Sequence, residues 1–240
     1  MSIAKELNLS TVIRPTLIGL EDTIIFDLFE RAKHKRNNNA YVPGAIHIPT
    51  PGKAISFFDY ILHGTESLHA SAGRYTSGDE IPFSQRLPPS LIQRRERSLP
   101  IQKIPINENP QILQTYLQAL DTICEEGEDH RYGASVVCDI KTLQDLSRRI
   151  HFGKYVAEAK YQEKPELYQS LIDLKDTDGI IDELTNIEVE IKIDERVKRK
   201  GEKYGMDPEF ISAFYRDKII PITKEVEVEY FMKRKNPLLN

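Results

Sequence analysis

Apolar residues recur at helical spacing along most of the chain and predict a series of amphipathic helices. The first is predicted over residues 15–35, because Pro15 suits a first turn in which its missing N–H would have no partner anyway. Arg14 is then expected at the mouth of this helix. The apolar positions that recur there are Leu17, Leu20, Ile24 and Leu28.

A second helix is predicted between the first one and the proline-rich segment, and the chain from Asn109 onward is predicted to be almost entirely helical. Residues 224–230 (KEVEVEY) also alternate as a strand would, but a longer apolar series at helical spacing continues through them, so we predict helix there. The segments predicted to be helical are 57–76, with Leu62 and Leu68 on its apolar side, 109–126, 139–162 capped by Asp139, a segment opened by Pro165, 182–203, and 208–230.

Six prolines from Pro82 to Pro110 forbid a long helix and predict an extended crossing loop over 82–110. The helices before this loop are too few to bury a core of their own, so we do not expect it to separate two domains. The predicted fold class is therefore all-α, a single-domain multi-helix bundle over residues 1–240.

Composition and charge exclude several classes of function. The chain carries 33 basic and 37 acidic side chains, and a net charge of −4 offers no general attraction for nucleic acid. No apolar run approaches the roughly 20 residues of a membrane helix, and Lys5 and Glu6 stand where a signal peptide would be apolar. Cys124 and Cys138 show no disulfide or CxxC spacing and are interpreted as reduced thiols of a cytoplasmic protein.

The short motifs of cofactor and metal enzymes are missing. The 12 glycines form no GxG, so neither a dinucleotide fingerprint nor a P-loop is available, and there is no GxSxG, HExxH or paired CxxC. We therefore expect no cofactor and no metal. An enzyme with this sequence would have to work through positioning and electrostatics.

Two cations are predicted to share one helical face. Arg149 and Lys160 are eleven residues apart, which is about 1100° of rotation and about 16 Å along an α-helix. The residues between them on that face are small or apolar, namely Gly153, Val156 and Ala157. Their long side chains could close on a small anion, because unpaired charge on a face fit for burial is costly.

Two further polar pairs have i,i+4 spacing, Asn186 with Glu190 and Thr223 with Glu227. Valines flank Glu227 in the sequence, so its carboxyl group is expected to be poorly solvated and protonated near neutrality. By geometry alone, intramolecular ion pairs and solvent-facing charges remain an open alternative for all of these residues.

Three longer blocks carry a resemblance to a known family. They are LIGLEDTIIFDLFERA (17–32), SRRIHFGKYVAEAKY (147–161) and IIPITKEVEVEY (219–230), and they resemble the eukaryotic all-helical chorismate mutases. The resemblance is close over 14–33 and 139–231 and weakest across the proline-rich loop. It implies a homodimer that isomerises chorismate to prephenate without a cofactor, the committed step toward phenylalanine and tyrosine.

The resemblance also implies residue roles. Arg14 and Arg149 match the arginines that hold the two substrate carboxylates, and Lys160 matches the lysine that reaches a carboxylate and the ether oxygen. The other matched positions are Asn186 and Glu190, near a carboxylate and the ring hydroxyl, and Thr223 and Glu227 on the last helix, with Glu227 donating a hydrogen bond to the ether oxygen.

Effector control is left open by the sequence. Fungal and plant members of the family are often regulated by tyrosine and tryptophan at the dimer interface. Arg74 remains from what is usually an arginine pair, whereas the glycine-serine turn of that site appears as Gly133-Ala134-Ser135, so its hydroxyl is displaced or lost.

Other functions compete with this interpretation. A catalytically silent regulatory or scaffolding paralogue should show substitutions in the pocket, and none of the seven matched residues is substituted. A helical module for another small dianion would need only Arg149 and Lys160. An RNA-binding reading rests on the run from Arg94 to Arg97, and the acidic balance of the chain disfavours it.

Overall fold

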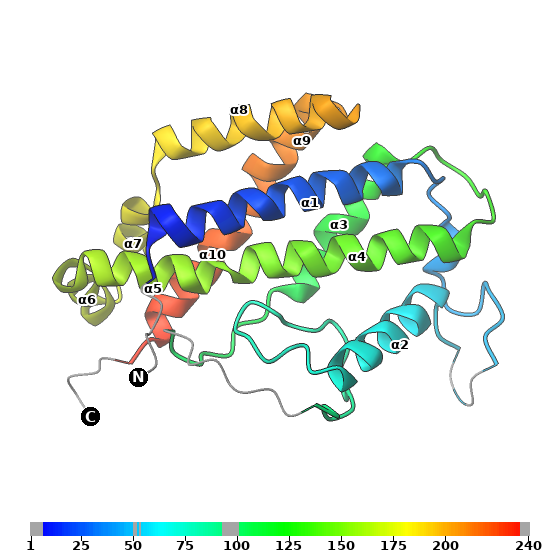
Figure 1. Cartoon of the computed structure of the whole chain (residues 1–240), viewed down its shortest axis with the longest axis horizontal. Coiled ribbons are helices and arrows are strands. Elements are labelled where there is room, and N and C mark those ends of the chain that lie inside the picture. The colour runs from blue at the N-terminus through cyan, green and yellow to red at the C-terminus, as the bar shows by residue number, and fades with distance from the viewer. Residues whose placement is uncertain (1–6, 50–51, 53, 93–100, 236–240) are drawn as a thin grey trace.

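The computed structural model describes residues 7–49, 52, 54–92 and 101–235, and within these ranges it contains α-helices, short helical turns and loops but no strand (Figure 1). The all-α fold class predicted from the sequence is confirmed. The helices are α1 (Arg14–Ala32), α2 (Phe57–Ser71), α3 (Asn109–Ile123), α4 (Tyr132–His151), α5 (Gly153–Glu163), α6 (Pro165–Leu174), α7 (Thr177–Leu184), α8 (Ile187–Tyr204), α9 (Pro208–Phe214) and α10 (Ile220–Lys233). The turns are η1 (Leu9–Ile13), η2 (Asn38–Ala40) and η3 (Tyr215–Ile219).

The helices pack lengthwise around one main core. Figure 1 shows α4 and α5 running end to end along the long axis, with α1 beside them and α8 beyond α1, while α10 crosses behind. The core draws apolar side chains from most of these helices, with Leu28 of α1, Leu143 of α4 and Val226 of α10 fully buried. No helix in the described part of the chain is long and apolar enough to cross a membrane.

The helix predicted over 139–162 is in fact two helices, and Asp139 is not its cap. Residue Phe152 separates α4 from α5, and α4 already begins at Tyr132. Asp139 lies inside α4 and is fully buried, where its carboxylate accepts hydrogen bonds from Arg31 Nε at 2.6 Å and from Tyr116 Oη at 2.7 Å. Sequence pattern favours Asp at a cap, but a buried guanidinium from α1 gives this carboxylate a stronger partner.

The helix predicted over 182–203 is also divided. α7 ends at Leu184, and α8 begins only at Ile187 because Asn186 adopts an extended backbone and its side chain accepts a hydrogen bond from the N–H of Val189. Asn186 is therefore an N-cap rather than a residue inside a helix. Helix α2 is shorter than predicted, and its Leu68 is 73% exposed instead of joining the apolar side.

Two π-helical turns each precede a proline within a longer helix. In η1 the N–H of Arg14 donates to the carbonyl of Leu9, just before Pro15. In η3 the N–H of Ile220 donates to the carbonyl of Tyr215, just before Pro221. Helical backbone thus begins at Leu9, earlier than predicted, and the helix predicted over 208–230 continues through a π-turn into α10, which includes the KEVEVEY segment. Such turns absorb the missing donor and ring bulk of proline inside a helix.

The crossing loop is non-helical over residues 82–92 and 101–108, whereas residues 109 and 110 already belong to α3, and residues 93–100 lie outside the described part. Buried charged side chains of α2 and α5 bind the backbone of this loop and of the segment just before it. Lys154 Nζ donates to the backbone carbonyls of Gly78 at 3.0 Å and Ile106 at 3.2 Å, and burial lowers the pKa of this lysine to about 8. The carboxylate of Glu66 accepts the backbone N–H groups of Phe83 and Ser84.

We predict that Asp139→Ala lowers the free energy of unfolding by about 3–5 kcal/mol, because it leaves the fully buried guanidinium of Arg31 without its carboxylate. Urea denaturation followed by circular dichroism measures this change. The matched control is Asp217→Ala, which breaks an exposed ion pair with Arg216 and should leave the midpoint in place. Equal effects in the two variants would contradict the prediction.

Candidate active site

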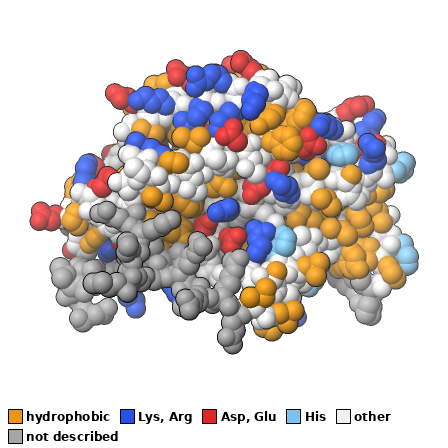
Figure 2. All heavy atoms as spheres, viewed as in Figure 1, with side chains coloured by type: hydrophobic (Ala, Val, Ile, Leu, Met, Phe, Trp, Pro, Cys, Tyr) orange, Lys and Arg blue, Asp and Glu red, His pale blue; other side chains and the backbone are white. Residues whose placement is uncertain are grey.

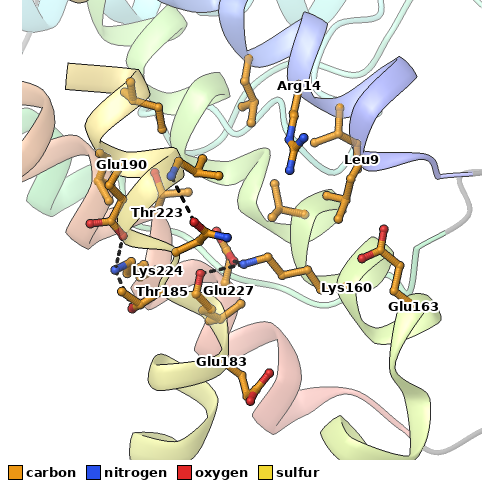
Figure 3. Close-up of a pocket in the computed structure, with 18 of the residues that line it drawn as sticks. Leu9, Arg14, Lys160, Glu163, Glu183, Thr185, Glu190, Thr223, Lys224 and Glu227 are labelled. Carbon is orange, nitrogen blue, oxygen red and sulfur yellow. Dashed lines mark hydrogen bonds and ion pairs between the residues drawn. The ribbon is translucent and has the colours of Figure 1, made fainter. Parts of the chain in front are cut away.

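A cavity of about 500 Å³ opens between η1, α4, α5, α8 and α10, and its wall contains charged residues from several distant parts of the chain (Figure 3). Apolar side chains of η1 and α5, including Ile13 and Val156, complete the wall. All seven residues matched to the catalytic and substrate-binding positions line it, namely Arg14, Arg149, Lys160, Asn186, Glu190, Thr223 and Glu227.

The three cations predicted from the sequence enter the cavity from different helices. Arg149 lies in the last turn of α4 and Lys160 near the end of α5, so the eleven-residue spacing does bring both to one cavity although the helix is interrupted between them. Arg14 comes from the start of α1, and Figure 3 shows its side chain pointing into the same space as that of Lys160. The proline-linked π-turn η1 directly precedes Arg14 and sets its place on the wall.

Arg149 is only 4% exposed and has unused hydrogen-bonding capacity. One Nη donates to the hydroxyl of Thr223 at 3.4 Å, and Nε has no partner. The Thr223 hydroxyl in turn donates to the carbonyl of Ile219 at 2.7 Å, which ties this residue to the π-turn η3. A buried guanidinium with an unpaired donor is suited to a carboxylate ligand, which would supply the missing acceptor.

Lys160 and Glu227 face each other across the cavity. Lys160 Nζ donates to the carbonyl of Leu184 at 2.8 Å and lies 3.9 Å from the Glu227 carboxyl group, a longer and weaker contact. Glu227 is 5% exposed, and its Oε2 has no hydrogen-bond partner. Burial raises the pKa of Glu227 to about 7, although Lys160, Arg149 and Lys224 each pull it down. The protonated form expected from the flanking valines is therefore substantially populated at neutral pH.

The α7–α8 connection supplies the polar wall opposite α5. Asn186 uses its side-chain oxygen to cap α8, so the amide NH2 remains as a donor on the cavity side. Glu190 forms an ion pair of 2.8 Å with Lys224 Nζ, which also donates to the hydroxyl of Thr185 at 2.9 Å. The ion pair holds the Glu190 carboxylate against α10.

Lys224 was not singled out from the sequence, yet it lines the cavity and contacts a predicted site residue. Its position beside Thr223 in the last matched block is the only signal that the sequence offered. Helical spacing could not pair it with Glu190, because the two residues come from different helices, α10 and α8, and their side chains meet only in the folded chain.

The residues predicted for an effector site are not gathered in one place within this chain. Arg74 lines a second depression of about 510 Å³ together with Val137. Gly133 and Ala134 are exposed in the first turn of α4 and do not line it. The nearby Ser135 hydroxyl is buried, where it donates to the carbonyl of Tyr132. This hydroxyl is therefore turned away from any ligand at the surface.

Metal-ligating side chains do not cluster in the described ranges, where no group of three or more His, Cys, Asp or Glu residues could hold an ion. The cavity instead mixes cations with carboxylates: Arg14, Arg149, Lys160, Lys164 and Lys224 against Glu163, Asp182, Glu183, Glu190 and Glu227. Such a site can bind a small anion, orient it and donate hydrogen bonds to it.

Comparisons with known proteins point in one direction. A family described as chorismate mutase type II matches residues 132–228. The chorismate mutase of Schizosaccharomyces pombe is 37% identical over 98% of this chain and 99% of that protein. The crystal structure of the Aro7p chorismate mutase from Candida albicans in complex with L-Trp has a TM-score of 0.92 at 36% identity, covering 100% of this chain and 98% of that one. The crystal structure of AtCM1 with tyrosine bound in its allosteric site has a TM-score of 0.88 at 39% identity, covering 97% of this chain and 98% of that one.

Proposed function

The chain belongs to the chorismate mutase family, whose isomerase reaction converts chorismate to prephenate, and from this premise we propose which of its residues carry that reaction. The chorismate mutases that this chain matches give no support to the alternative of a catalytically silent paralogue. The observation that carries our assignment is that all seven matched residues line one cavity. The reaction is a unimolecular rearrangement, so the site has to hold one conformation of the substrate and stabilise the charge that develops as a bond breaks.

We assign substrate binding first to two arginines. Arg14 and Arg149 bind the two carboxylates of chorismate, since guanidinium groups pair with carboxylates through two parallel hydrogen bonds that fix orientation as well as charge. The unpaired Nε of Arg149 supports this role. With both carboxylates held, the extended substrate is compressed into the chair from which the new carbon–carbon bond can form.

Lys160 and Glu227 act on the ether oxygen. As the carbon–oxygen bond breaks, negative charge grows on this oxygen, and donors fixed beside it stabilise the transition state more than the ground state. Lys160 donates from its ammonium group and Glu227 from its protonated carboxyl group. The 3.9 Å separation of the two groups and the raised pKa of Glu227 support a pair of donors around one acceptor.

The remaining residues orient the rest of the substrate. Asn186 offers its amide NH2 to a carboxylate, Glu190 accepts from the ring hydroxyl, and Thr223 holds the Arg149 guanidinium. The ion pair with Lys224 supports the role of Glu190, because it holds that carboxylate in place on the wall of the cavity.

Lys160→Ala should lower kcat by at least about 100-fold, which is the usual cost of removing one donor from a charge that develops in the transition state. The loss of chorismate absorbance in the presence of EDTA measures the rate, with prephenate confirmed by its acid conversion to phenylpyruvate. Lys198→Ala, which removes a lysine from the surface of α8, is the control and should retain the full rate. A near-normal kcat for Lys160→Ala would remove this residue from the mechanism.

The pH dependence of kcat/KM should follow the titration of Glu227. Because this carboxyl group donates only when protonated, the donor form is present below its pKa of about 7 and is lost as the pH rises through that value. We expect kcat/KM to fall on the alkaline side, and Glu227→Gln, which keeps an N–H donor at every pH, to flatten this limb. Glu225→Gln makes the same charge change on the exposed side of α10 and should keep the wild-type profile. An unchanged alkaline limb in Glu227→Gln would sink the assignment.

We further propose that the protein is a homodimer that binds an aromatic amino acid, tyrosine or tryptophan, at the subunit interface. Support comes from the structures of relatives with L-Trp or tyrosine bound. It also comes from the apolar surface that Figure 2 shows over α2 and the adjoining end of α4. Leu68 of α2 and Val137 of α4 are large apolar side chains that are 73% and 60% exposed. Because Arg74 and the Gly133-Ala134 turn lie apart in one chain, a shared site needs a second subunit.

Tyrosine or tryptophan should change the rate of chorismate turnover, and Arg74→Ala should abolish that response, because Arg74 lines the depression and its guanidinium can pair with the effector carboxylate. Turnover measured across an effector titration tests this, with light scattering reporting whether the protein is a dimer. A rate that neither amino acid alters in a confirmed dimer would show an unregulated enzyme.

We also propose that the protein acts in phenylalanine and tyrosine biosynthesis in the cytoplasm. The free thiols of Cys124 and Cys138 support a reducing compartment. A fluorescent fusion observed in living cells tests the location.

A further inference from the structure

Gly153, the first residue of α5, lies where α10 approaches most closely to the catalytic face. A β-carbon placed on this glycine would lie 3.0 Å from the backbone oxygen of Thr223, 3.2 Å from Thr223 Cγ2 and 3.3 Å from Glu227 Cγ. Carbon atoms in favourable contact are about 3.5–4.0 Å apart, so a side chain here would force the two helices apart.

Space, rather than backbone conformation, explains this glycine. Gly153 is not among the residues with positive φ, so an L-residue could adopt its backbone without strain. A helical glycine that packing does not require has open space around it. Gly19 in α1 is an example, because no atom lies within 4 Å of a β-carbon built there. The β-carbon of a residue at position 153 would meet Thr223 and Glu227, two residues of the cavity wall.

Its place along the helix matters as well. Gly153 is four residues after Arg149 and seven before Lys160, so it lies on the face that carries both cations. The two residues of α10 that it contacts are Thr223 and Glu227, one helical turn apart. Because Gly153 has no side chain, Thr223 and Glu227 of α10 can lie close to the helical face that carries the two cations.

We propose that Gly153 is a positioning residue, whose missing side chain sets the distance between α10 and the cations of α4 and α5. Its effect on the reaction passes through Thr223 and Glu227, so the inference rests on the roles proposed for these two residues. A methyl group would displace Thr223 and Glu227 by a few tenths of an ångström, since contacts of 3.0 to 3.3 Å have to relax toward ordinary packing distance.

Gly153→Ala should lower kcat by about tenfold or more, because a misplacement of about 1 Å at a catalytic group can cost on the order of 100-fold. Alanine is the better helix former, so the fold should persist with a similar melting temperature. The matched control is Gly19→Ala, which adds the same methyl group to an exposed helical position and should leave kcat unchanged.

The pH profile separates positioning from a general loss of packing. The groups that face Glu227 are Lys160 of α5, Arg149 of α4, Tyr168 of α6 and Lys224 of α10 itself. Moving α10 away from α5 lengthens the 3.9 Å separation from Lys160 and weakens the attraction that lowers the pKa of Glu227, while the added methyl group keeps water out. The alkaline limb of kcat/KM should therefore move to higher pH in Gly153→Ala.

A double variant gives a second test and remains informative should Gly153→Ala fold poorly. Thr223→Ser keeps the hydroxyl group but removes Cγ2, one of the three atoms in the way. We expect the cost of Gly153→Ala to be smaller in the Thr223→Ser background than in the wild type, a coupling that independent sites do not show.

The outcomes distinguish this inference from the proposed function. A wild-type kcat and alkaline limb in Gly153→Ala, or purely additive effects in the double variant, would overturn the positioning role even where Glu227→Gln flattens the profile as proposed. An unaltered profile in Glu227→Gln would instead remove the function of Glu227 on which the inference rests.

Discussion

The proposed chemistry depends on one cavity, where two cations and one carboxyl group from three different helices lie close together. Arg149, Lys160 and Glu227 line it from α4, α5 and α10, and Arg149 and Glu227 are each about nine-tenths or more buried. Burying ionised groups costs more than their attraction returns unless the geometry is favourable. Here burial raises the pKa of Glu227 to about 7, and Nε of Arg149 has no hydrogen-bond partner, which makes the cavity complementary to an anion that accepts hydrogen bonds.

That arrangement needs rigid helices at short distances, and buried polar contacts outside the cavity supply them. Asp139 joins α4 to α1 and α3 through Arg31 and Tyr116, away from the chemistry. At the other end of the site, the carboxylate of Glu158 on α5 pairs with Arg234 just after α10, which holds the two helices in register. The groups of α5 and α10 that we propose as donors are thus held in place by the fold itself, which is the condition for electrostatic stabilisation of a transition state.

Prolines shape the walls of the cavity. Pro15 and Pro221 each lie inside a run of helical backbone, and each is preceded by a π-turn. These turns position Arg14 on one wall and Thr223 on the other, since the hydroxyl of Thr223 bonds to a carbonyl of the second turn. Proline would break a regular helix. In this protein the π-turn before each proline accommodates it and changes the direction of the side chains that follow.

Sequence alone determined the features that depend on local spacing: the all-α class, the helical choice at 224–230, the shared face of Arg149 and Lys160, and the poorly solvated environment of Glu227. These follow from the fixed rotation of the α-helix and from the apolar neighbours of one residue. The tertiary structure decided what depends on which helices meet. It placed Asp139 inside the core, made Asn186 a cap, joined Lys224 to Glu190 and brought α10 so close to Gly153 that a β-carbon there would be crowded. Each of these outcomes is set by a partner far away along the chain, and helical periodicity carries no information about that partner.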